Sequence, residues 1–175
     1  MGTKYFAFTF PIRKEDVLES YRSLAEVQHL IDSGVAQNHT LMSASLRNWT
    51  VWKIELLASK YGAQNLKFVS EVLTILDNRQ MCNAIVDIEN ILARAKENPE
   101  PFLYTLDASH EDHQEDGAAL GELYSSATNM RPSLDGRANE GDTAWYLIAY
   151  LKSLLAVLRE AREHSFYVIH VRHEP

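Results

Sequence analysis

The sequence contains few residues of the kinds that cross-link a chain or surround a bound phosphate. Among its 175 residues are one cysteine and seven glycines. The single Cys82 excludes an intramolecular disulfide and favours a reducing compartment. It lies in the apolar pattern of Met81, Ala84 and Ile85, which predicts a buried thiol rather than a reactive one. So few glycines leave little material for a phosphate-binding loop.

Motifs of nucleotide, redox and metal enzymes are missing as well. The chain has no G-x-x-x-x-G-K, G-x-G-x-x-G, C-x-x-C or H-E-x-x-H pattern, and no G-x-S-x-G elbow. These absences disfavour a nucleotide-driven enzyme, and we expect no cofactor.

No hydrophobic run is long enough for a membrane helix, which needs roughly 20 apolar residues. The aromatic run Lys4–Phe10 is short, and Pro11 and several charged residues follow it. That pattern does not fit a secretion signal. We therefore expect a cytoplasmic protein that does not enter a membrane.

Basic residues are outnumbered, with 17 Lys and Arg against 24 Asp and Glu and a net charge of −7. A nucleic-acid partner is disfavoured, because binding phosphates requires a basic face. The excess acid comes from one segment, residues 97–116, which holds seven acids and no Lys or Arg. Such a concentration of one charge is typical of a surface that attracts a basic partner.

Alternating side chains predict one strand near each end of the chain. Phe6, Phe8 and Phe10 alternate with smaller residues in 4–10, and a similar alternation occupies 165–172. A lone strand leaves its backbone groups unpaired, so we expect the two strands to pair with each other. The same pairing can form across a homodimer.

Between the strands, apolar residues recur with the period of helices. We predict helices at 14–33, 43–61, 65–77, 79–97 and 143–164, and a short one near 118–127. Gly34 and Gly62 are placed to end the first two, and Pro99 to end the fourth. The expected fold is mostly α: a bundle-like single domain over residues 1–175, with about five helices and a small two-stranded element.

Two polar stretches, 105–117 and 130–141, interrupt the helices, and long loops are often functional or mobile. The first contains the candidate partner-binding residues, namely Asp107, His110, Glu111, Asp112, His113, Glu115 and Asp116. The same imidazoles and carboxylates suit a divalent metal. A loop lacks the rigid support that metal ligands need, however, and the run also fits a solvated acidic loop.

Arg159 and His164 form a second candidate. An arginine followed after four to six residues by a histidine occurs in the helical HEPN ribonucleases, where the pair would stabilise phosphate charge and act on the 2′-hydroxyl or the leaving group. The spacing is unspecific, because Arg22 and His29 match it too. The acidic Glu160 beside Arg159 also opposes an RNA phosphate.

The remaining aromatic and histidine residues are predicted to be structural. We expect Trp49, Trp52 and Trp145 in the core rather than in a ligand cage. His170 alternates with neighbours that are expected to be buried, and the residues after it, Arg172, His173 and Glu174, fit a frayed terminus.

The hypothesis favoured by these patterns is a small acidic interaction protein. It would bind a more basic protein and inhibit or neutralise it, as immunity proteins do, with the acidic segment accelerating association. The alternative is an enzyme, either a HEPN-like ribonuclease or a metal-dependent hydrolase that uses the cluster from His110 to Asp116.

Overall fold

The computed structural model describes residues 4–32, 41–106, 113–127 and 144–173. Its helices are α1 (Leu24–Asp32), α2 (Asn48–Tyr61), α3 (Asn78–Glu97), α4 (Pro99–Leu106), α5 (His113–Tyr124) and α6 (Ala144–Glu163), with 3-10 turns η1 (Lys14–Asp16) and η2 (Gln64–Ser70). Its strands are β1 (Lys4–Ile12), β2 (Leu41–Arg47), β3 (Leu73–Leu76) and β4 (Tyr167–His173). Among these described residues, no helix has both the length and the apolar character needed to cross a bilayer.

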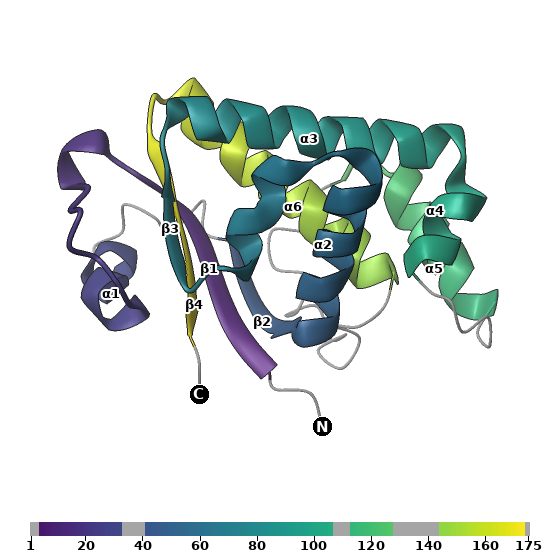
Figure 1. The fold of residues 1–175 in the computed structure, drawn as a ribbon, viewed down its shortest axis with the longest axis horizontal. Helices are drawn as coiled ribbons and strands as arrows, with labels where there is room; N and C mark the ends of the chain where they lie inside the picture. The colour runs from purple at the N-terminus through teal and green to yellow at the C-terminus, as the bar shows by residue number, and fades with distance from the viewer. Residues whose placement is uncertain (1–3, 33–40, 107–112, 128–143, 174–175) are drawn as a thin grey trace.

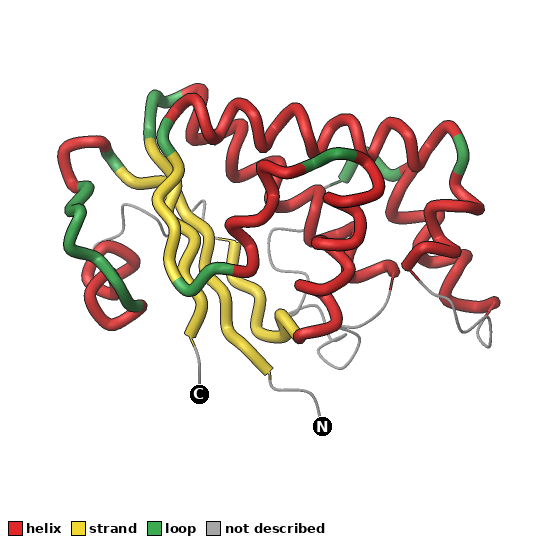
Figure 2. The backbone as a smooth tube through the Cα atoms, viewed as in Figure 1, coloured by secondary structure: helices red, strands yellow, loops and turns green. Residues whose placement is uncertain are grey.

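The terminal strands pair with each other within one chain, as predicted. β1 and β4 run antiparallel, with Phe8 opposite Val171, Thr9 opposite His170 and Phe10 opposite Ile169. The element is larger than the predicted two-stranded one, because β2 and β3 add an antiparallel strand at each side. The four described strands have the order β2-β1-β4-β3 (Figure 2).

Helices cover both faces of this sheet (Figure 1). On one face, Phe10 and Ile169 pack with Val27 and Leu30 of α1. The opposite face, which includes Val168, joins the larger core formed with α2, α3 and α6. Side chains alternate across a strand, so the alternation in the sequence divides the strand residues between two cores.

α6 is the centre of the larger core. Almost every residue from Ala144 to Leu158 is buried, and burying one leucine side chain contributes roughly 1.5–3 kcal/mol. α3 lies along α6 with its apolar stripe inward, and its start is fixed by a capping box between Asp77 and Gln80. The predicted helices at 79–97 and 143–164 are thus confirmed over their described residues.

Two predicted helices are wrong over part of their length. Residues 43–47 belong to β2, and α2 begins only at Asn48. It ends at Tyr61, directly before Gly62, whose φ is +71°. Residues 65–77 form η2 and then β3. In 72–76 the apolar positions fit either period, and the sheet edge beside β4 favours the β-branched Thr74 and Ile75 as strand.

The other boundary errors concern helix starts. In place of one helix at 14–33, η1 is followed by α1, which begins at Leu24. There the Glu26 carboxylate accepts hydrogen bonds from the amides of Arg22 (2.6 Å) and Ser23 (2.9 Å), and the Arg22 amide lowers the pKa of Glu26. Pro99 begins α4 rather than only ending α3, because proline suits a first helical turn.

A buried histidine lies at the centre of the sheet. His170 is 0% exposed, its Nδ1 lies 2.9 Å from the Thr9 hydroxyl, and its ring packs edge-on against Phe68. Burial lowers the pKa of His170 to about 4, with the Arg172 charge adding to the effect and the Val69 backbone opposing it. His170 is therefore neutral in the folded protein at pH 7. Arg172 and His173 belong to β4, so the predicted frayed terminus is wrong at these two residues.

Replacing His170 with Asn removes the titration and retains a polar partner for Thr9. The wild type should lose up to about 3 kcal/mol of stability from this group as the pH falls from 6.5 to 4, because the unfolded chain takes up the proton first. Urea unfolding at both pH values checks this. His170→Asn should be less stable at pH 7 by about 2 kcal/mol but should lose less on acidification, and equal losses would contradict the account.

Candidate functional site

The predicted acidic site lies mostly outside the described residues. Residues 107–112 are outside the described residues. His113, Glu115 and Asp116 fall in the first turn of α5, where only the backbone is described. The run is therefore helical from His113 onward and not a loop to Gly117, and α5 starts five residues before the predicted short helix. Within the described residues no three His, Cys, Asp or Glu side chains are placed to hold a metal.

Two lysines of α2 contact α4, which lies within the acidic segment of residues 97–116. Lys53, only 4% exposed, donates to the Thr105 carbonyl at 3.1 Å. Lys60 donates to the Pro101 carbonyl at 3.4 Å and to the Thr105 hydroxyl. The carbonyl end of a helix carries partial negative charge, so these ammonium groups hold the end of α4 against α2. α4 is therefore anchored to α2.

Large aromatic side chains are exposed at this junction. Trp52 is 54% exposed and Tyr104 58%. The Lys53 ammonium lies 4.6 Å from the centre of the Trp52 ring as well as on the Thr105 carbonyl, so Trp52 and the end of α4 are neighbours. The prediction that Trp52 is a core residue is wrong, because Lys53 takes the inward position, whereas Trp145 is buried as predicted.

The structure does not bring Arg159 and His164 into one site. Arg159 forms an ion pair with Glu89 of α3 at 2.7 Å. His164 lies past the end of α6, where its Nδ1 is 3.0 Å from the Glu160 carbonyl and its ring stacks on Phe166. The two side chains are thus held by different partners.

Arg159 instead contributes to a cleft of about 350 Å³ between α3, α5 and α6. The described residues that line it are Glu89, Leu92, Ala93 and Lys96 of α3, Lys152, Leu155, Ala156 and Arg159 of α6, and Leu123, Ser125 and Ser126 at the end of α5. Three cations and one carboxylate thus line a cleft in a protein of net charge −7. A concave site with an apolar floor and a few polar groups is the usual form of a small-ligand site.

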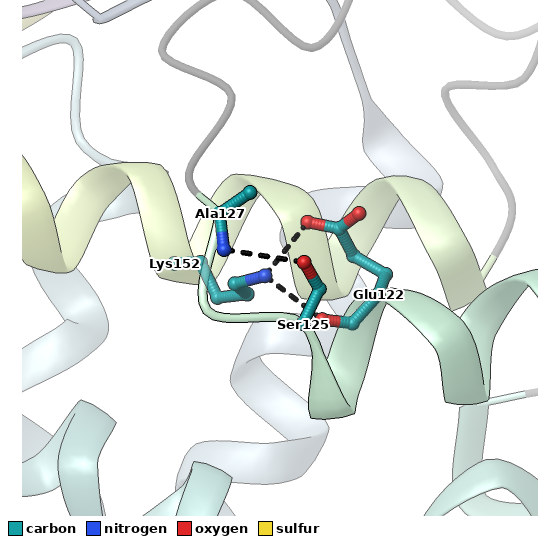
Figure 3. A network of polar contacts seen from close by, with 4 residues as sticks. All are labelled: Glu122, Ser125, Ala127 and Lys152. Atoms are coloured by element: carbon teal, nitrogen blue, oxygen red, sulfur yellow. Dashed lines mark hydrogen bonds and ion pairs between the residues drawn. The ribbon is translucent and has the colours of Figure 1, made fainter.

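A polar network forms one end of this cleft (Figure 3). Lys152 reaches the last turn of α5, where it donates to the Glu122 carbonyl at 2.8 Å and to its carboxylate at 3.0 Å. The Ser125 hydroxyl accepts from the Ala127 amide at 3.1 Å. Tyr124 donates to the Lys96 carbonyl at 3.0 Å and so joins α5 to α3. The end of α5 is thereby fixed to both walls.

A second hollow, of about 430 Å³, lies between the chain near Tyr21 and strand β3. Its cation, Arg22, donates to the carbonyls of Glu19 and Tyr21, and two carboxylates, Glu19 and Glu71, share its rim. With its cation held by the backbone, this hollow offers less to a ligand than the first cleft.

The residues of the first cleft were missed from the sequence, although a signal was present. Both long walls carry the same spacing, charged–x–x–Leu–Ala–x–x–basic, at 89–96 and at 152–159. Positions i, i+3, i+4 and i+7 share one helix face. The signal is uninformative until the two helices are known to face each other.

Comparison of the chain with protein-family models, with curated proteins and with solved structures finds no match. We therefore infer function from the residues themselves.

Replacing Lys53 with Met tests the anchor of α4. We expect a loss of about 1–2 kcal/mol in the free energy of unfolding, because the Thr105 carbonyl loses a charged donor in a buried place. Lys60→Met is the matched control. Lys60 is exposed, and its loss should change stability by about 0.5 kcal/mol or less. Urea unfolding of both variants measures the difference, and equal losses would show that burial of Lys53 is unimportant.

Proposed function

We propose that the protein is a small acidic interaction module that binds a more basic protein and inhibits or neutralises it. The observation that carries the proposal is the exposure of aromatic side chains beside the end of α4, the helix that precedes residues 107–116 in the sequence. Trp52 and Tyr104 are exposed where α2 meets α4, and the chain enters the acidic residues 107–116 directly after α4.

The two parts of this surface serve different steps of association. Carboxylates attract a basic partner over about 8 Å at physiological salt and so raise the association rate. Tryptophan and tyrosine are the side chains that most often dominate binding energy at protein interfaces. A partner covered at its basic surface by such a module is blocked from its own anionic ligand, which is the inhibitory effect proposed.

The anchor at α4 supports this division. Lys53 holds the Thr105 carbonyl and lies over the Trp52 ring, so Trp52 and the end of α4 keep a fixed relation. A fixed arrangement reduces the entropy lost on binding. The exposed Glu97 and Glu100, at the junction of α3 and α4, extend the same negative charge.

The partner can be captured by a photo-crosslinking amino acid at position 52, with position 86 as control, because Val86 is also an exposed large apolar residue but lies on α3. We expect a basic protein captured at 52 and not at 86. Identical capture at both positions would contradict the proposal.

Neutralising the acidic segment should slow binding to the captured partner. In the variant Glu111→Gln, Asp112→Asn, Glu115→Gln, Asp116→Asn, the association rate should fall about tenfold at low salt, with a small effect on the dissociation rate. The control variant neutralises the exposed Glu15, Glu19, Glu71 and Glu163 and changes the net charge equally. Surface plasmon resonance at several salt concentrations measures both, and equal slowing would assign the effect to total charge.

Trp52→Ala should act on the dissociation rate rather than on the association rate. We expect affinity to fall about 30-fold, mainly through faster dissociation, as for a dominant interface residue. Val86→Ala, matched in exposure, should leave affinity unchanged. An unchanged affinity in Trp52→Ala would remove the aromatic anchor from the proposal.

A further inference from the structure

The cleft between α3, α5 and α6 has two chemically different ends. Glu89 pairs with Arg159, so the first charged position of the α3 wall meets the last of the α6 wall, and the two helices run antiparallel (Figure 1). The other charged positions, Lys96 and Lys152, therefore lie together at the opposite end. Seven residues of helix separate the ends by about 10 Å.

The lysine end of the cleft has hydrogen-bond donors that can bind a ligand. Lys152 uses its ammonium on Glu122, which leaves Lys96, whose side chain is exposed and forms no hydrogen bond or ion pair with any described residue. Ser126, also exposed, lines the same cleft with Ser125. An ammonium group and hydroxyls are donors that can bind the oxygens of a phosphate.

The floor between the ends is apolar. Leu92 and Leu155 are 9% and 6% exposed, and each is followed by an alanine in the lining. The small alanine side chains leave room between the helices. No aromatic residue is among the described lining residues, so a nucleobase would have no stacking partner there.

We propose that this cleft binds a small phosphate monoester with a short aliphatic body. The phosphate lies at the lysine end, on Lys96, Ser126 and the outer face of Lys152, and the aliphatic body covers the floor of Leu92 and Leu155. The Glu89–Arg159 ion pair forms the far end. The proposal goes beyond the partner-binding function, because the cleft contains none of the residues assigned to that surface and either can fail without the other.

Isothermal titration of the full chain with n-butyl phosphate and with inorganic phosphate tests this. Butyl phosphate should bind at least about tenfold more tightly, because burying two methylene groups alone corresponds to that factor. Pentanoate, with the same n-butyl body and a planar anion, should bind more weakly than butyl phosphate. No heat of binding with either phosphate at millimolar concentration would overturn the proposal, as would tighter binding of pentanoate.

Substitutions inside and outside the cleft test whether butyl phosphate binds there. Lys96→Gln should weaken butyl phosphate binding about tenfold, whereas Lys67→Gln, an exposed lysine outside the cleft, should leave it unchanged. Glu89→Gln should strengthen binding several-fold, because it removes the carboxylate of the lining and frees Arg159, while Glu163→Gln controls for net charge. Equal effects within each pair would overturn the assignment to this cleft.

Discussion

The pairing of β1 with β4 is the constraint on which the rest of the structure depends. It joins residues near the two ends of the described chain, and closing so long a loop is entropically costly. The cost is offset by α6, which is buried almost throughout and leads into β4 through a single tight turn. In that turn Ser165 has a φ of 58°, and the Phe166 amide bonds the Ala161 carbonyl at 2.8 Å, a helix-ending motif that directs β4 back along the sheet.

This arrangement places opposite charges on different parts of the helical layer. α6 and α3 run antiparallel, and their outer faces form the basic cleft. α4 and α5 lie at the far end of α3 from the sheet (Figure 1). α5 links the two surfaces, since the acidic segment enters it at His113 and its last turn is held by Lys152.

The helices and strands that could be predicted from the sequence are those with a regular apolar periodicity and well-marked boundaries. α3 and α6 have long apolar patterns, and the terminal strands alternate cleanly. β2 and β3 did not follow, because they are edge strands whose formation depends on β1 and β4 already being paired. Of the candidate site, only the acidic segment could be predicted from the sequence, and only from its charge. The exposure of Trp52 depends on the inward turn of Lys53, and the cleft depends on two alanines facing across antiparallel helices, so neither is legible in a single segment.

Native-state hydrogen exchange tests the central role of the β1–β4 pair most directly. Amides of Phe10 and Ile169, which face each other across the β1–β4 pair, should exchange only through global unfolding, with the same opening free energy as amides in the middle of α6, such as those of Leu151 and Leu154. The contradicting result is exchange of the strand amides at an opening free energy several kcal/mol below that of α6. It would show that the helices remain folded when the strand pairing is broken.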